Sequence, residues 1–179
     1  GNMEEAVAEL DVSYTDAFGN DFSRATGKFT ITAPTSPADS NSGVWFIEQL
    51  GPTPSAGLRN LPVLPEGWVY EGWMGIPIVQ VEPGKVMEFF RYFSTGRFVR
   101  ADSADMDGAG LGKGPGSGFD FPGQDFITAY AGGPPPRGDL RSRAFMVSVE
   151  PEPDNSASPF ILKVLSTPSP RTLLPQGEA

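Results

Sequence analysis

Carboxylates are the side chains in this sequence with the most obvious chemistry. The 179-residue chain carries 22 acidic and 13 basic side chains. Two carboxylic acids that flank a sugar linkage can hydrolyse it. Nothing in the spacing brings two acids together, and chance pairs are expected among so many, so we predict no enzyme and no catalytic residues. The candidates for such a pair are Glu48, Glu71, Glu88, Asp120, Asp125 and Glu150.

The missing residue types narrow the chemistry further. The sequence contains no histidine and no cysteine. Ser-His-Asp and Cys-His catalysis are therefore excluded, and so are zinc sites of the usual kind. Disulfides and thiolate nucleophiles are excluded for the same reason.

An aspartate-rich segment suggests a calcium loop, because Asp102, Asp105 and Asp107 offer closely spaced oxygen ligands. An EF-hand loop that began at Asp105 would place Ala109 at its fifth position and Gly116 at its twelfth, where a bidentate carboxylate is required. The pattern therefore fails as an EF-hand. An irregular calcium site and a solvated acidic loop both stay open; we favour the solvated loop and predict no metal site.

The glycine run from Gly108 to Gly118 suggests a phosphate-binding loop. In a P-loop numbered back from Gly112 and Lys113, Asp107 stands where the first glycine belongs. Gly114 stands where a serine or threonine should hold magnesium. We therefore predict a flexible surface loop and no cofactor.

Four aromatic residues, Trp45, Trp68, Tyr70 and Trp73, suggest either a glycan platform or a hydrophobic core. Strand alternation places Trp68 and Tyr70 on the face opposite Trp73, so at most one group faces solvent. We predict that these side chains fill the core. A carbohydrate-binding module, with two exposed aromatic side chains on one sheet face, stays as the alternative.

The elements that would position these residues are strands. Period-2 alternation and turn clusters rich in Gly, Pro, Asn, Asp and Ser recur along the chain. At most one or two short helices are expected, and 121–131 is the segment that could hold one. Segment 85–100 is ambiguous between helix and strand, and we prefer a strand. The pattern predicts one all-β domain over residues 1–179, an antiparallel β-sandwich of about seven strands. A long Gly/Pro-rich insertion is expected at about 102–141 and a mobile tail from about 167. The predicted strands are 6–14, 28–33, 43–50, 68–74, 92–100, 143–150 and 159–165.

Charge and hydropathy bound the partners. The net charge is -9, which repels polyanions, so we predict no nucleic-acid partner. No apolar run reaches membrane-spanning length. The start at Gly1-Asn2-Met3 is typical of tag removal, so we expect that a signal peptide or lipid anchor can lie upstream.

Three segments in order resemble a known family. Leu61–Trp73 has a Leu-Pro lead-in followed by Gly, Tyr and Trp; Ser94–Phe98 contains a Gly-x-Phe strand; Phe145–Pro151 ends in Glu-Pro. Together they resemble the extracytoplasmic domain of anti-sigma-K-like anti-sigma factors, especially the variant found in secreted bacterial lipoproteins. The resemblance implies a β-sandwich outside the cytoplasmic membrane without catalytic activity.

The departures from that family limit what the resemblance implies. The cytoplasmic sigma-binding segment, its His/Cys zinc motif and the transmembrane helix have no counterpart here, and the loop at 102–141 is longer. We therefore expect only the outer domain's role: a non-enzymatic interaction or sensor module of the bacterial cell envelope. Its expected location is the periplasm or cell surface, and its partner an envelope protein or glycan. A carbohydrate-binding module is the alternative, and a glycoside hydrolase-type enzyme the third hypothesis.

Overall fold

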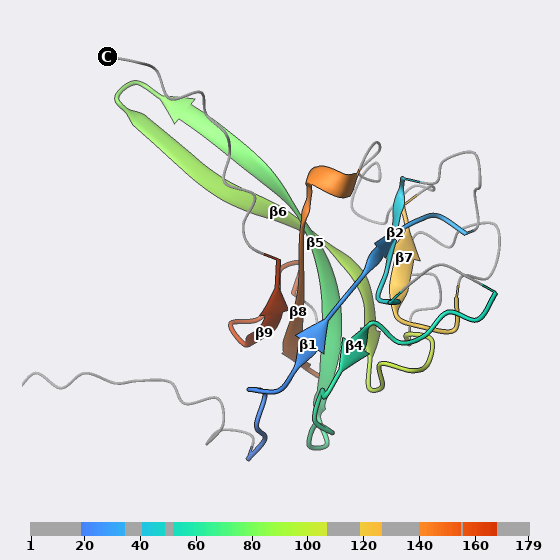
Figure 1. Ribbon diagram of the computed structural model, residues 1–179. Coiled ribbons are helices and arrows are strands. Elements are labelled where there is room, and N and C mark those ends of the chain that lie inside the picture. The colour runs from blue at the N-terminus through green and yellow to red at the C-terminus, as the bar shows by residue number, and fades with distance from the viewer. Residues whose placement is uncertain are drawn as a thin grey trace, which may run out of the picture.

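The protein is an all-β structure (Figure 1). A computed structural model describes residues 19–34, 41–48, 52–106, 119–126, 140–154 and 156–167. These residues form nine strands in three sheets, and every pairing between neighbouring strands is antiparallel. Within these ranges the helical content is one 3-10 turn, η2 (Leu140–Ser142). The prediction of an antiparallel all-β chain is confirmed.

A four-stranded sheet forms the larger layer, with strand order β6-β5-β8-β9. Its central feature is a long hairpin made of β5 (Trp68–Glu82) and β6 (Lys85–Phe98). Pro83 and Gly84 close the hairpin, and the φ of 78° at Gly84 suits the second central position of a type II turn. β8 (Ala144–Pro151) pairs with the other edge of β5, and β9 (Lys163–Ser166) pairs with β8.

Two smaller sheets form the second layer. One contains β2 (Thr30–Ile31), β3 (Gly43–Trp45) and β7 (Gly123–Asp125). The other pairs β1 (Thr26–Gly27) with β4 (Leu58–Arg59). Both pack against one face of the four-stranded sheet, so the core lies between the layers as in a sandwich.

Alternation along β5 decides which side chains enter this core. Tyr70 and Met74 face the smaller sheets, whereas Glu71 and Trp73 face the opposite side. Tyr70 stacks on Phe98 with ring centroids 5.6 Å apart and donates its hydroxyl to the Pro62 carbonyl at 2.6 Å. The hydroxyl is therefore satisfied inside an apolar cluster.

Gly72 lies on β5 between the core residues Tyr70 and Met74, at a position where a larger residue would not fit. A Cβ at Gly72 would lie 2.1 Å from Thr95 Oγ1 and 2.6 Å from the Phe46 ring. The missing side chain lets Phe46 of the smaller layer rest directly on the β5 backbone. The two layers are thus in direct contact at Gly72.

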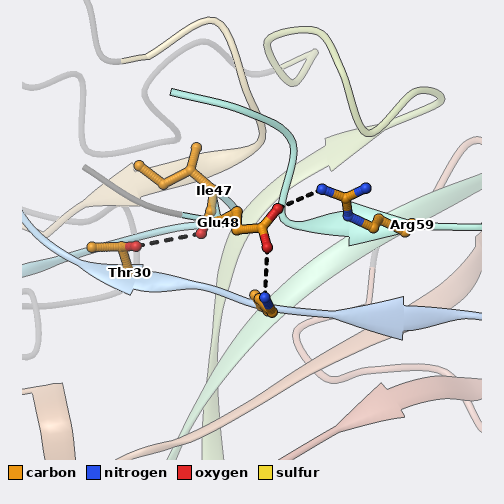
Figure 2. Close-up of polar contacts among 5 residues, drawn as sticks. Thr30, Ile47, Glu48 and Arg59 are labelled. Carbon is orange, nitrogen blue, oxygen red and sulfur yellow. Dashed lines mark hydrogen bonds and ion pairs between the residues drawn. The ribbon is translucent and has the colours of Figure 1, made fainter. Parts of the chain in front are cut away.

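Glu48 links strands of the smaller layer (Figure 2). Its carboxylate pairs with Lys28 at 2.6 Å and with Arg59. Nearby, the Thr30 hydroxyl donates to the Ile47 carbonyl at 3.3 Å. The hydrogen bonds from Lys28 and Arg59 hold the pKa of Glu48 below its ordinary value. Glu48 is therefore a structural ion-pair residue on the surface.

Two element predictions are corrected. A helix was expected within 121–131, but Gly123–Asp125 forms strand β7 beside β3. A Cβ at Gly123 would lie 2.6 Å from the Trp45 ring, so this glycine suits close strand packing. The strand predicted at 92–100 begins earlier, at Lys85. The predicted strand 6–14 and residues 127–131 lie outside the described residues.

Within the described ranges, no helix has the length and apolar character needed to cross a membrane.

Candidate functional site

The outer half of the β5–β6 hairpin leaves the sheet. β8 pairs with β5 from Trp68 to Gly75, whereas β6 pairs with β5 as far as Glu82. Residues 76–91 therefore form a two-stranded projection, here called the arm, which extends beyond the rest of the described chain (Figure 1). Its strands run for roughly 20 Å, since each strand residue advances about 3.3 Å.

Pro77 explains why the sheet splits at this point. If pairing alternates back from the turn at Glu82 and Lys85, the pair Pro77 and Phe90 is a non-hydrogen-bonded one, whose backbone groups point away from each other. Pro77 is then the first residue after Gly75 whose backbone nitrogen faces the β8 side. Proline has no N–H to donate to β8, and β8 itself begins at Ala144, shortly after the 3-10 turn η2, so the ladder ends at Gly75.

The arm exposes apolar side chains on both of its faces. Val81 lies opposite Val86 on one face, and they are 72% and 57% exposed. Phe89 lies opposite Ile78 on the other face and is 46% exposed. Val79 is also exposed. Several exposed large apolar side chains on one short ribbon make the arm a candidate interaction surface.

Charge also separates the arm from the rest of the chain. Within residues 76–91 the acids Glu82 and Glu88 balance the bases Lys85 and Arg91, so the arm is neutral while the whole chain carries -9. Long-range attraction therefore contributes little to binding at the arm, and apolar contact and backbone hydrogen bonds must dominate.

The root of the arm is rigid and aromatic. Tyr92 stacks on Phe90 with centroids 6.0 Å apart and meets the edge of Trp73 at 6.4 Å. The Lys163 ammonium lies 5.8 Å from the Tyr92 ring centroid. The projection is thus held by packed side chains where it joins the sheet.

The structure separates most of the candidate carboxylates. Asp125 is buried and accepts a hydrogen bond from Trp45 Nε1 at 2.7 Å. Asp120 is exposed, and Glu48 belongs to the ion pairs already described. The side chain of Glu88 lies outside the described part of the chain. Glu71 and Glu150 do come together, close to Asp154, but both are buried.

The aspartate-rich segment does not form a cation site within its described residues. Asp102 binds the exposed Arg100 guanidinium through two contacts of 2.9 Å. Asp105 is buried and accepts a hydrogen bond from the Gly123 amide at 3.2 Å. The two carboxylates therefore have separate structural roles. Asp107 and the glycine run at 108–118 lie outside the described residues.

The aromatic side chains belong to the protein interior. Trp45, Tyr70 and Trp73 are buried, and Trp68 is partly buried and packs against Phe160 at 5.9 Å. The prediction that these residues form packed structure is confirmed. They do not present the flat exposed array that a carbohydrate-binding module needs.

An apolar cavity of about 210 Å³ lies between the β1–β4 pair and β8–β9. Its walls include Phe29, Phe46, Leu58, Phe145 and Leu165, and none of its lining residues is titratable. The cavity therefore offers no acid or base that could activate the hydroxyls of Ser166 and Thr167 on its wall.

No protein-family model matches this chain, and neither does any curated protein or solved structure. The resemblance to anti-sigma-K-like outer domains therefore stays a prediction. What the chain does must be argued from the geometry of its own residues.

Sequence reasoning missed both the arm and the third acid of the buried cluster. The signal for the arm was present: Pro83-Gly84 is a turn signature, flanked by apolar segments of similar length. Pro77 argued against a continuous strand there, because proline is usually excluded from the interior of a strand. Asp154 follows a proline in a turn, and nothing in its local sequence relates it to Glu71.

Proposed function

We propose that this chain is a non-enzymatic interaction module that binds an extended segment of a partner protein along its β5–β6 arm. The observation that carries the proposal is the arm itself, a two-stranded ribbon with exposed valine and phenylalanine side chains. An isolated two-stranded hairpin is marginally stable in water. A third strand or a packed apolar surface would stabilise it.

Two properties of the arm favour an extended peptide as the occupant. Along the outer edge of β6, residues such as Val86 and Phe90 direct backbone groups away from β5 if the pairing alternates from the turn. An added strand satisfies such groups and gains affinity from main-chain hydrogen bonds. Each large apolar side chain that becomes fully covered contributes about 1.5–3 kcal/mol before ordering costs are subtracted.

The other edge of the arm, along β5, is less suited to strand addition. Pro77 removes a donor from the outer edge of β5, a device that discourages strand addition there. The proposed docking edge is therefore that of β6. A sided edge gives a single mode of binding, which a specific interaction module needs.

The proposed setting is the bacterial cell envelope, in the periplasm or at the cell surface. This part of the proposal rests on the three segments that resemble anti-sigma-K-like outer domains, Leu61–Trp73, Ser94–Phe98 and Phe145–Pro151. In a sensor role, binding of the partner to the arm would be the event that triggers a signal. Catalysis has little support, because the paired acids Glu71 and Glu150 are buried and the apolar cavity lacks titratable groups.

Site-specific photo-crosslinking tests the proposal. A benzoyl-phenylalanine at Val86 or Val81 should yield a discrete adduct in a cell-envelope extract from the source bacterium. The matched control is Val63, an exposed valine outside the arm. Mass spectrometry of the adduct should place the crosslink in an extended segment of another protein.

The control outcomes are equally specific. Adducts of equal yield at Val63 and Val86 would show non-specific stickiness and overturn the proposal. An adduct between two copies of this chain would replace the partner protein with self-association. Absence of any arm adduct, with the protein folded by circular dichroism, would also overturn it.

A further inference from the structure

A buried acidic cluster lies on the face of the four-stranded sheet opposite the core. It consists of Glu71 in β5, Glu150 near the end of β8 and Asp154 in the turn that follows β8. One carboxylate oxygen from each residue lies within 4.8 Å of the others. Across the described chain no other group of three or more acidic side chains meets in this way.

Two oxygens of the cluster are buried without a hydrogen-bond partner among the described residues. Glu71 is 5% exposed and Glu150 is fully buried. Their Oε1 atoms accept hydrogen bonds from the Ser94 and Ser148 hydroxyls, and Glu150 Oε1 also accepts the Phe160 amide at 2.8 Å. The Oε2 atoms of both glutamates are unpartnered. A buried carboxylate oxygen without a partner is costly, so these two oxygens are candidates to bind a ligand.

Negative charge dominates around the cluster. Arg97 pairs with Glu152 at 3.0 Å and also favours the ionised form of Glu71. One guanidinium thus stands against four carboxyl groups, those of Glu71, Glu150, Glu152 and Asp154. A bound cation would offset this excess of negative charge.

We propose that this cluster is a calcium site, with Glu71, Glu150 and Asp154 as its carboxylate ligands. The donor set consists of oxygen atoms, which suits a hard cation. Asp154 is only partly buried, so it provides the solvent side through which the ion enters with its remaining waters. Calcium completes its shell of 6–8 oxygens with such waters and with hydroxyl or carbonyl groups.

The coordination chemistry favours calcium over magnesium. The three oxygens lie within 4.8 Å of one another, which is inside the span of about 5 Å that two calcium ligands can have. Calcium accepts irregular arrangements of oxygen ligands, whereas magnesium requires near-octahedral geometry and gives up its waters reluctantly. Carboxylates that are held in place by hydrogen bonds to strand residues therefore suit the more tolerant ion.

A set of hydrogen bonds orients the ligands. Trp73 Nε1 donates to Ser148 Oγ at 2.8 Å, and the Gly96 amide donates to Ser94 Oγ at 3.1 Å. Each serine in turn binds one glutamate, so both carboxylates are aimed by groups anchored in strands. Outer-shell partners of this kind tune metal affinity. Bound calcium would tie the turn that follows β8 to the sheet.

Calcium titration of the intact chain tests the proposal. Isothermal titration calorimetry should detect one site, and calcium should raise Tm in a manner that EGTA reverses. Asp154→Asn should weaken calcium binding at least about tenfold, and Ser94→Ala should weaken it about 10–100-fold. Asp120→Asn is the control with the same charge change at an exposed position, and it should leave the affinity unchanged.

Terbium luminescence provides a readout that is independent of folding stability. Terbium occupies oxygen-rich calcium sites, and the Trp73 indole, two hydrogen bonds from Glu150, should sensitise its emission. Calcium should displace terbium, and Trp73→Phe should reduce sensitised emission more strongly than Trp45→Phe.

Three results would overturn the assignment. The first is that the wild-type chain does not bind calcium at millimolar concentration. The second is that it binds magnesium as tightly as calcium. The third is that Asp154→Asn and Asp120→Asn lower the calcium affinity equally. Glu71→Gln distinguishes a metal site from a group that only shares protons. If this substitution stabilises the chain, and calcium has no effect on the wild-type protein, the cluster shares protons and is not a metal site.

Discussion

The two halves of the β5–β6 hairpin are both rich in apolar residues but lie in opposite environments. From Trp68 to Gly75, β5 has strands on both edges and the smaller sheets on one face. From Ile76 to Glu82 it keeps only β6 as a neighbour. The inner half can therefore bury acids as well as apolar groups, whereas the outer half exposes even its valines. Apolar alternation alone thus does not distinguish a core strand from an exposed one.

The largest difference in stability between the two halves should appear when a phenylalanine is truncated in each. Phe98 is fully buried and stacks on Tyr70, whereas Phe89 on the same strand is 46% exposed. Phe98→Ala should lower the free energy of unfolding by about 3–5 kcal/mol. Phe89→Ala should lower it by less than about 1 kcal/mol, because its ring is not enclosed. Urea denaturation measures both, and equal losses would mean that the arm packs against the body of the protein.

The buried acid of the inner half predicts a pH dependence of stability in buffer that contains a chelator. The folded state raises the pKa of Glu71 to about 7, above the ordinary value of 4.5. The folded chain then binds more protons than the unfolded chain between these values, so stability falls as pH rises through that window. The contribution is fully present below pH 4.5 and is lost above about 7, an effect of roughly 3 kcal/mol.

Glu71→Gln checks this prediction, because glutamine cannot ionise; the fall in stability with pH should become shallower, and the part due to Glu150, whose pKa burial also raises, should remain. Glu48→Gln provides the opposite case. The pKa of Glu48 is lowered by its hydrogen bonds to Lys28 and Arg59, so its contribution is present above the ordinary value and is lost in acid. Chemical denaturation from about pH 3 to pH 8 should therefore show opposite effects of the two variants: Glu71→Gln weakens the fall in stability above pH 4.5, and Glu48→Gln weakens the fall below pH 4.5. Parallel profiles would contradict the assignment of the raised pKa to Glu71.

Shortening the arm should have the smallest effect on stability. Removal of Gln80, Val81, Val86 and Met87 deletes two cross-strand pairs and joins Val79–Glu88 directly to the pair Glu82–Lys85. Because the deletion preserves alternation, the free energy of unfolding should change by less than about 1 kcal/mol. Thermal melts test the stability, and crosslinking from Phe89 tests whether partner binding is lost. A large fall in Tm would show that the arm supports the core.

Several parts of this architecture were predictable. The alternation that sets Tyr70 opposite Trp73 is confirmed, because period 2 is a local property of a strand. The preference for strand over helix at 85–100 is confirmed as well, although the strand begins at Lys85. The expected helix at 121–131 is wrong for Gly123–Asp125, because pairing with β3 overrides local preference.

The candidate sites were less predictable. Glu71 and Glu150 stood among the six acids that were considered, but nothing in the sequence paired them, and Asp154 was not considered. Their meeting depends on the register of β5 against β8, where Glu71 lies opposite Ser148. It also depends on the turn after β8, which places the Phe160 amide on Glu150. Register is a long-range property that depends on packing.

Composition and periodicity alone commit this chain to an all-β structure and exclude the chemistry of histidine and cysteine. Both conclusions follow from properties of single residues and their near neighbours. The tertiary structure decides which half of a long strand stays inside the sheet and which carboxylates share one buried space. These outcomes depend on contacts between segments far apart in the chain, such as the ladder between β5 and β8, which ends at Gly75 just before Pro77.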